Sequence, residues 1–377
     1  MKNRAQIFSF FSGVGFLDLG FEDENFEIVY VNENHKPFIE AYKYSRGILG
    51  YSPPQYGYGY YSIRKILKEP IKTKIDNHII NSRKESNIVG FIGGPPCPDF
   101  SVGGKNKGKY GDNGILSRTF IEVIIRFQPD FFLFENVKGL LRTKKHRAFF
   151  DELKTDLKGG GYILTEKLIN ATEYEVPQDR DRIILIGVNK NVIKRNKIDF
   201  LTDEMVFNGN FPWSQYAKYA EREAFSFTWP KTIPFKEDSI IPKPKGIPVD
   251  LTVQYWFEKN DVNNHPNSFH HFKPRAGLKR FKTIDEGDDS KKSFKRLHRW
   301  RYSPTASYGN NEVHIHPYKA RRITVAEALA IQSMPKSFIL PSDMSLTNMF
   351  KAIGNGVPYC ASKALAKSLN KFLAEIL

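Results

Sequence analysis

Cysteine is scarce in this sequence of 377 residues, which contains only Cys97 and Cys360. Two distant cysteines exclude a disulfide framework and a zinc site made mainly of cysteine, so we expect no metal and a reducing compartment. The sequence also lacks any run of about 18 apolar residues, which argues against a transmembrane helix. No apolar segment with a cleavage site follows Met1, so the sequence predicts a cytoplasmic protein rather than a secreted one.

Acidic residues are the minority among the charged side chains: 41 Asp and Glu stand against 57 Lys and Arg, a net charge of +16. The excess is concentrated in His270–Arg322, which holds 14 basic and 5 acidic residues. Aromatic residues such as Trp300 and Tyr302 are interleaved with these charges. A solvated basic loop and a surface that neutralises nucleic-acid phosphates both remain open at this point.

The first 190 residues alternate short apolar runs with amphipathic stretches, which is typical of an α/β protein with a parallel sheet. The expected strands are Ile7–Phe11, Phe26–Val31, Ile88–Ile92, Phe131–Phe134, Tyr162–Leu168 and Arg182–Val188. The expected helices are Phe16–Gly20, Lys36–Tyr44, Arg118–Phe127, Ala148–Lys158, Thr324–Ser333 and Val357–Leu377. After about residue 190 this alternation dissolves. We therefore expect two domains, one formed by 1–190 with 336–377 and the other by 191–335.

Glycines follow the first predicted strand, in Phe11-Ser12-Gly13-Val14-Gly15. Glycine lets a backbone turn tightly and approach a cofactor, and the start of the following helix favours an anionic group. Glu33 ends the second predicted strand, 18 residues after Gly15, near where an acidic residue would bind ribose hydroxyls. The glycine spacing is shorter than that of the dinucleotide-binding motif. A plain tight turn, a nucleoside site and a nicotinamide-dependent enzyme therefore remain alternatives.

Two glycines and two prolines precede Cys97 in Gly93-Gly94-Pro95-Pro96-Cys97, directly after the strand predicted at Ile88–Ile92. Proline restricts the backbone, and active groups of α/β sheets gather at the carboxyl ends of strands. An isolated cysteine is more often an inert packing residue. The crowding by glycine and proline favours a positioned thiol instead.

Charged residues stand at the ends of two further predicted strands. Glu135 follows Phe131–Phe134, where partial desolvation would suit its carboxyl group to share a proton. Arg180 and Arg182 open the strand at Arg182–Val188, and alternation directs both to one face. They could hold an oxyanion or a base carbonyl, or form a solvated strand edge. Near the last helix, Gly354-Asn355-Gly356 could be a plain turn or could contact a cofactor carboxylate.

Taken together and in this order, these motifs resemble those of the DNA cytosine-5 methyltransferase family, of the bacterial restriction–modification type. The resemblance rests on F-S-G-V-G, N-E-N-H, G-G-P-P-C, F-E-N-V, Q-D-R-D-R, R-R-I-T-V-A-E-A and G-N-G-V-P. It implies a Rossmann-like methyltransferase sheet with helices on both faces, plus a smaller, irregular, mostly β target-recognition domain. It also implies a monomer that binds double-stranded DNA in the bacterial nucleoid, uses S-adenosylmethionine and releases S-adenosylhomocysteine.

The resemblance also implies roles for individual residues. Cys97 would be the nucleophile. Glu135 would hold ring nitrogen 3 of the cytosine, and Arg182 would lie near its carbonyl oxygen, with Arg180 in support. The residues implied for the S-adenosylmethionine pocket are Phe11, Ser12, Gly13, Gly15, Glu33, Asn34, Ser62, Ile63, Pro96, Leu116 and Asn355.

The sequence departs from the family pattern at three positions. Pro98 stands where Gln usually follows the cysteine, which puts in doubt how the gap left by a flipped base is filled. Ala352 stands where Gln usually precedes Ile-Gly-Asn, and Ser62 stands where an Asp usually contacts the adenine. None of these changes removes a group that the implied chemistry needs.

The implied reaction begins when the Cys97 thiolate adds to carbon 6 of a flipped cytosine, which makes carbon 5 nucleophilic toward the methyl donor. The sequence thus predicts a sequence-specific DNA methyltransferase, the protective half of a restriction–modification system. Its cognate restriction enzyme would act on the same site without needing to bind it. An RNA methyltransferase of the same family and a catalytically silent DNA-binding protein remain alternatives. Candidates to touch base edges or phosphates are Asn263, Asn264, Arg275, Arg299 and Arg301.

Overall fold

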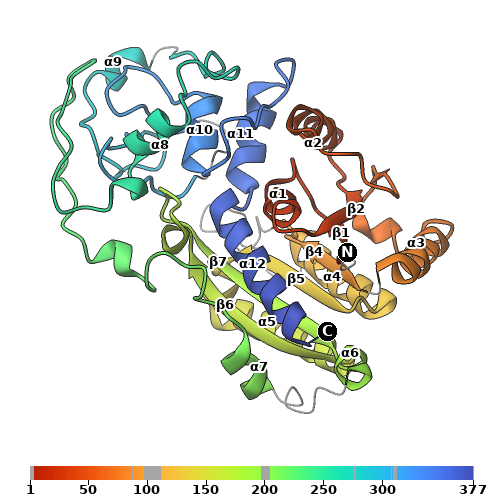
Figure 1. The fold of residues 1–377 in the computed structure, drawn as a ribbon. Helices are drawn as coiled ribbons and strands as arrows, with labels where there is room; N and C mark the ends of the chain where they lie inside the picture. The colour runs from red at the N-terminus through yellow and green to blue at the C-terminus, as the bar shows by residue number, and fades with distance from the viewer. Residues whose placement is uncertain are drawn as a thin grey trace.

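The chain forms a mixed α/β structure around one sheet, seen in a computed structural model that describes residues 4–86, 88–96, 112–196, 204–274, 277–306, 308 and 312–376. The sheet has seven strands in the order β3-β2-β1-β4-β5-β7-β6 (Figure 1). Their bounds are β1 Gln6–Phe10, β2 Glu27–Asn32, β3 Tyr58–Gly59, β4 Val89–Gly93, β5 Phe131–Val137, β6 Tyr162–Asn170 and β7 Asp181–Asn189. Each predicted strand is therefore confirmed to within about three residues at either end.

Strand direction agrees with the prediction of a parallel sheet at every strand except β7. The pairs from β3 to β5 are parallel, but β7 runs antiparallel to both β5 and β6. The connection between β6 and β7 holds only a short 3₁₀ turn, η4 (Ala171–Tyr174), which is too short for the crossover that parallel neighbours require. The prediction of an all-parallel sheet was wrong at this strand.

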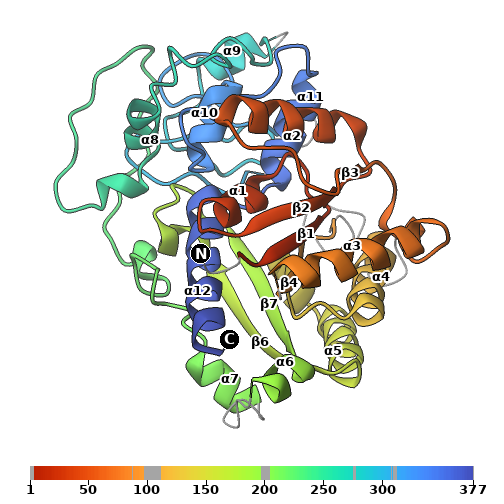
Figure 2. The ribbon, with the colours of Figure 1, turned by 45° about the vertical axis from the view of Figure 1, so that its right-hand side comes forward.

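Helices cover both faces of the sheet, as predicted (Figure 2). Neighbouring strand residues such as Ile7 and Phe8 belong to different hydrophobic clusters, because successive side chains point to opposite faces. One face packs against α1, α2, α6, α7 and α12, and the other against α3, α4 and α5. The bounds are α1 Phe16–Glu22, α2 Lys36–Leu49, α3 Ile71–Ser86, α4 Asp112–Phe127, α5 Lys144–Gly159, α6 Lys190–Arg195, α7 Glu204–Asn210 and α12 Tyr359–Ile376.

The last helix, α12, closes against the first, α1. Ser362 donates a hydrogen bond from Oγ to the carbonyl of Leu17 at 2.6 Å, and a Cβ at Gly20 would collide with Ser362. The apolar face predicted for this helix, which includes Leu365 and Phe372, is buried. Among the described residues, α12 and the other helices are all too short or too polar to cross a lipid bilayer.

Residues 204–335, which we call the irregular region, contain short helices and isolated bridges joined by irregular segments. The helices are α7, α8 (Val253–Lys259), α9 (Leu278–Phe281) and α10 (Val325–Ile331), with 3₁₀ turns η6 (Glu223–Phe225) and η7 (Val249–Leu251), and α11 (Leu346–Asn355) follows. In the described part of this region the bridges are single pairs such as Ile233–Glu286, and none extends into a strand. The expected irregularity is confirmed, but the expected β character was wrong. Prolines such as Pro242 and Pro244 lack the N–H that a ladder needs.

Thr324 caps α10, and Glu327 completes a capping box, as the sequence pattern indicates.

One contact bears on the predicted domain boundary. Phe207, Phe211 and Trp213 pack in the same core as α12 and the sheet. The start of the irregular region therefore lies against the sheet, while the division into 1–190 with 336–377 and 191–335 stays a prediction.

Candidate active site

The loop after β1 carries the glycines singled out in the sequence. Phe11, Gly13 and Gly15 have positive φ angles of 53°, 58° and 84°. A Cβ at Gly13 would meet no atom within 4 Å, whereas one at Gly15 would lie 2.5 Å from the Tyr42 ring. Gly15 is thus needed for packing, and Gly13 faces open space where another molecule could approach the backbone.

Glu33 links this loop to the end of β2. Its Oε2 accepts from the Gly13 N–H at 3.0 Å, and its Oε1 accepts from the His35 N–H at 2.8 Å. The carboxylate is therefore fixed in place and keeps lone pairs for further donors, such as ribose hydroxyls. Asn34, beside it, is exposed.

A buried polar network, which the motifs in the sequence do not indicate, supports the glycine loop. Ser12 Oγ lies 2.9 Å from Ser9 Oγ, and Ser9 Oγ donates to Asp18 at 2.8 Å. Arg46 donates to the Gly15 carbonyl at 2.6 Å and pairs with Glu22 at 2.7 Å. Burial raises the pKa of Asp18, although Arg46 and Ser9 oppose that shift. An aspartate within the apolar run of α1 was the sequence signal for this network.

Ser62 and Ile63 follow β3 at the same edge of the sheet. Ser62 is half-buried and precedes the 3₁₀ turn η1 (Ile63–Lys65), in which Ile63 is buried. Asn32, at the end of β2, donates to the carbonyls of Gly59 at 2.9 Å and Tyr61 at 3.0 Å. These bonds hold the segment that carries Ser62 next to the segment that carries Glu33.

Pro96, Leu116 and Asn355 come from three separate elements. Pro96 is exposed just after β4, Leu116 is half-buried on α4, and Asn355 is exposed at the end of α11. Phe120, one turn after Leu116, packs edge-to-face on Phe11 with ring centroids 5.9 Å apart. Leu116 therefore lies on the α4 face that meets the glycine loop. Gly356, next to Asn355, packs on Phe16, which directly follows that loop.

Glu135 and Arg182 form a largely buried ion pair. Arg182 Nε lies 2.7 Å from Glu135 Oε1, and the two side chains are 12% and 10% exposed. The antiparallel register places Arg182 opposite Val137, two residues from Glu135 on the neighbouring strand. Pairing of the two sequence-predicted groups thus depends on the reversed direction of β7.

Gly94 leaves room for the Glu135 carboxylate. A Cβ at this position would lie 2.6 Å from Glu135 Oε2. Gly94 therefore lies directly beside the ion pair. Cys97, three residues after Gly94, lies outside the described residues.

Arg180 does not share the position of Arg182, although alternation predicted one face for both. It is 1% exposed and donates from Nη2 to the carbonyls of Gly354 and Gly356, each at 2.9 Å. Burial, the largest cause, lowers its pKa well below the usual value, and the charge of Arg182 acts in the same direction. Arg180 thus fastens the turn around Asn355 to the start of β7, which is a supporting role.

Within the described residues, no group of three His, Cys, Asp or Glu side chains is placed to hold a metal ion. The site instead combines an open glycine turn, a fixed carboxylate and an arginine–glutamate pair. All of these lie at the carboxyl ends of β1, β2, β4 and β5 or at the adjoining start of β7, the edge where α/β sheets bind ligands.

Comparison with known proteins identifies the family. Residues 5–371 match the model of the C-5 cytosine-specific DNA methylases. The chain is 54% identical over 372 residues to the Type II methyltransferase M.NmeDI of Neisseria meningitidis serogroup C, covering 99% of this chain and 85% of the relative. It is 28% identical to the Type II methyltransferase M.MthTI of Methanothermobacter thermautotrophicus, with 98% of both chains covered.

A solved structure shows the same fold. The protein is encoded within an E. coli prophage and named as a DNA modification methyltransferase. It superposes with a TM-score of 0.65 at 23% identity, covering 98% of this chain and 99% of its own. The class defined by the fold and site is thus a Rossmann-like methyltransferase. The chain belongs to the C-5 cytosine-specific DNA methylase family, and it is an enzyme.

Proposed function

We propose that this enzyme transfers a methyl group from S-adenosylmethionine to carbon 5 of a flipped-out cytosine in duplex DNA, through a covalent bond between Cys97 and carbon 6. The observation that carries the proposal is the Glu135–Arg182 pair at 2.7 Å, beside the glycine segment that leads to Cys97. Cys97 follows Gly94 by three residues, and three residues of chain reach at most about 11 Å.

The glycine loop and Glu33 fit S-adenosylmethionine, which supplies an electrophilic methyl group when bound. Gly13 leaves open space at the backbone, and the fixed Glu33 carboxylate offers acceptors for ribose hydroxyls. Phe11 supplies apolar surface for an adenine ring, and Ser12, Gly15, Asn34, Ser62, Ile63, Pro96, Leu116 and Asn355 complete the proposed pocket. Support comes from the elements that carry these residues, which meet at one edge of the sheet.

The cytosine would be activated by this chain's own side chains. The Cys97 sulfur would bond to carbon 6, and the ring electrons displaced toward carbon 5 would form the new bond to the methyl carbon. The bond from that methyl carbon to the sulfonium sulfur would break at the same time, with S-adenosylhomocysteine as the leaving group. The Glu135 carboxyl group would share a proton with ring nitrogen 3 and so offset the charge that develops there, while Arg182 would donate to the carbonyl oxygen. A base then removes the carbon-5 proton, and the sulfur–carbon bond breaks to restore the thiolate and the aromatic ring.

The biological setting is part of the same proposal. The matched relatives are Type II methyltransferases, which supports a role as the protective half of a restriction–modification system, alongside a restriction enzyme that acts on the same site. We further propose that the enzyme is a cytoplasmic monomer and that 191–335 recognises the target. Light scattering of the purified chain with and without DNA tests the monomer.

The test of the reaction uses tritiated S-adenosylmethionine with mixed duplex DNA, and with tRNA in a parallel reaction. We expect label in DNA with the wild type and a loss of at least about 1,000-fold with Cys97→Ser, because the alcohol is a far weaker nucleophile than the thiolate. Cys360→Ser is the matched control and should keep near-wild-type labelling. Equal labelling by Cys97→Ser, or label confined to tRNA, would refute the proposal.

A further inference from the structure

The turn that joins α11 to α12 is held by three buried side chains from other parts of the chain. Gln178, Arg180 and Gln332 are 0%, 1% and 0% exposed. Gln332, at the end of α10, donates a hydrogen bond from Nε2 to the carbonyl of Ile353 at 2.6 Å. Arg180 donates to the carbonyls on either side of Asn355, each at 2.9 Å. The backbone that carries Asn355 is therefore fixed from two directions.

The donors and acceptors in this network can be arranged in only one way. The Ala306 N–H donates to Gln178 Oε1 at 3.0 Å, so Gln178 Nε2 is left to donate to Gln332 Oε1 at 3.3 Å. Gln332 Nε2 is then the atom that donates to the Ile353 carbonyl, which can only accept. Arg180 Nη1 also donates to Gln178 Oε1, at 3.4 Å, which closes a ring of hydrogen bonds that includes the turn. Because each member is buried, the loss of one donor leaves a carbonyl with too few partners.

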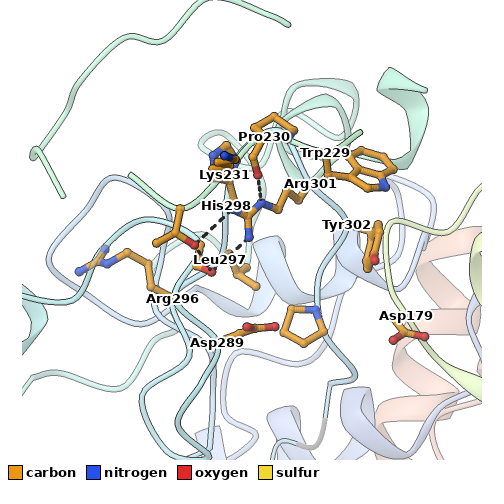
Figure 3. Close-up of a pocket in the computed structure, with 13 residues that line it drawn as sticks. Asp179, Trp229, Pro230, Lys231, Asp289, Arg296, Leu297, His298, Arg301 and Tyr302 are labelled. Atoms are coloured by element: carbon orange, nitrogen blue, oxygen red, sulfur yellow. Dashed lines mark hydrogen bonds between the residues drawn. The ribbon is translucent and has the colours of Figure 1, made fainter. Parts of the chain in front are cut away.

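Asp179 lies between Gln178 and Arg180 in the chain but faces a different space. It lines a cavity of about 530 Å³ in the irregular region, together with Trp229 and Tyr302 (Figure 3). Gln178 forms a single bridge of the kind found between strands, and neighbouring side chains of such an extended segment point to opposite sides. The segment before β7 therefore presents Asp179 to this cavity, and Gln178 and Arg180 to the turn.

The turn reaches the proposed cofactor pocket on the side of β1. A Cβ at Gly356 would collide with the ring of Phe16, the residue that follows the glycine loop. The strands lie in the order β2-β1-β4-β5, so β1 and β4 separate Glu33 from Glu135. A cofactor whose ribose binds Glu33 must extend across β1 to bring its methyl group near Glu135. Its amino-acid chain is attached to the same sulfonium sulfur and therefore starts on the β1 side of the ribose, where the turn meets Phe16.

We propose that Gln332 is a positioning residue for the cofactor, because it fixes the turn so that Asn355 meets the amino-acid end of S-adenosylmethionine. Gln332 acts through the backbone of the turn and does not itself touch the cofactor or the cytosine. The inference rests on the proposed function, since it requires S-adenosylmethionine in the pocket. Gln332 belongs to the irregular region, so this region takes part in cofactor binding as well as in the proposed recognition of the target.

The experiment compares two ligands by titration calorimetry of the full-length protein: S-adenosylhomocysteine, and adenosine, which lacks the amino-acid end. Gln332→Met keeps the length of the side chain but removes the donor, so the Ile353 carbonyl retains the longer bond from the Gly356 N–H at 3.3 Å. We expect the affinity for S-adenosylhomocysteine to fall roughly tenfold. The affinity for adenosine should change by less than about twofold, because its proposed contacts with Phe11 and Glu33 are untouched.

Gln332→Asn keeps the amide on a side chain one methylene shorter, and it should show the same selective loss even if the methionine variant does not fold. The matched control is Gln6→Met, a buried glutamine at the opposite end of β1 that donates to Glu27 at 3.1 Å. It should leave both affinities unchanged. Equal losses for the two ligands in the Gln332 variants, or an unaltered affinity for S-adenosylhomocysteine, would overturn the inference. Failure of the proposed function is distinguishable, because the wild type itself would then bind neither ligand.

Discussion

The sheet and the irregular region solve the same problem, that of pairing buried backbone groups, by different means. In the sheet, the ladders between neighbouring strands pair N–H with C=O groups directly. In the irregular region, buried arginines donate hydrogen bonds to backbone carbonyls that have no partner in a neighbouring strand. Arg296, 0% exposed, donates to the carbonyls of Ile284 at 2.8 Å and Lys319 at 3.0 Å, and also to those of Phe281, His316 and Pro317.

Arg299 shows the same behaviour and changes the meaning of the basic sequence. It is 3% exposed and forms a two-pronged pair with Glu286 at 2.7 and 2.8 Å. The sequence makes Arg299 a candidate for touching DNA, but its side chain is buried and paired in the interior. The lysines in the same run, Lys291 and Lys292, are exposed. Part of the positive charge therefore stabilises the fold, and the surface carries the remainder.

The largest expected effect tests whether Arg296 replaces a strand ladder. Arg296→Met should lower the free energy of unfolding by about 3 kcal/mol or more, because several buried carbonyls lose their donor at once. Urea unfolding curves of the two proteins give the difference. The control is Lys291→Met, from the same basic run but exposed, which should change stability by less than about 0.5 kcal/mol. Equal losses of stability in the two variants would contradict the claim that Arg296 replaces a strand ladder.

The next effect concerns the end of β4, where the proposed role of Glu135 depends on the absence of a side chain at Gly94. Gly94→Ala should displace the Glu135 carboxylate and lower kcat by about 100-fold, because small displacements of a catalytic group are costly. The affinity for S-adenosylmethionine and the unfolding midpoint should change little. Gly159→Ala is the control, since no atom lies within 4 Å of its Cβ position. A Gly94→Ala enzyme with wild-type kcat would show that Glu135 does not need this clearance.

The smallest effect is a pH dependence within the irregular region. Burial lowers the pKa of His314 to about 3, and Lys295 and Arg322 act in the same direction. The folded state then binds fewer protons than the unfolded state below pH ~6.5, so this contribution is complete above that pH and is lost as the pH falls toward 3. His314→Gln should make the stability curve shallower by up to about 1.4 kcal/mol per pH unit in that window. Urea unfolding between pH 4 and 7 measures the slope, and parallel curves would contradict the prediction.

The sheet strands were predictable because apolar runs bounded by glycine and charged residues are strong signals. The short β3 and the helix α3 were missed. The sequence of α3 has a polar majority with isoleucines such as Ile75 and Ile79 as its buried positions, which is a weak helical pattern. Strand direction was not predictable at β7, since it depends on the length of a connection that holds little regular structure. The expectation of a mostly β irregular region came from the family resemblance. The contacts between arginines and carbonyls that hold this region leave no periodic pattern in the sequence.

The candidate site was predictable to the extent that its residues end strands. Glu33, Glu135 and Arg182 lie at the strand ends where the sequence placed them, and the structure joins the last two in an ion pair. The role of Arg180 was less visible, because its partners are the carbonyls of Gly354 and Gly356. Backbone carbonyls carry no signature in a sequence. The same holds for Gly94, whose contribution is the empty volume beside Glu135.

The contact between α12 and α1 has a consequence for biosynthesis. Ser362 and Leu17, joined by a hydrogen bond, are separated by 345 residues, and a ribosome adds about 5–20 residues per second. The glycine turn is therefore synthesised tens of seconds before α12, the helix that packs against α1 in the complete chain. We therefore expect translation products that end before α12 to lack methyltransferase activity, because their glycine turn has no helix packed against it.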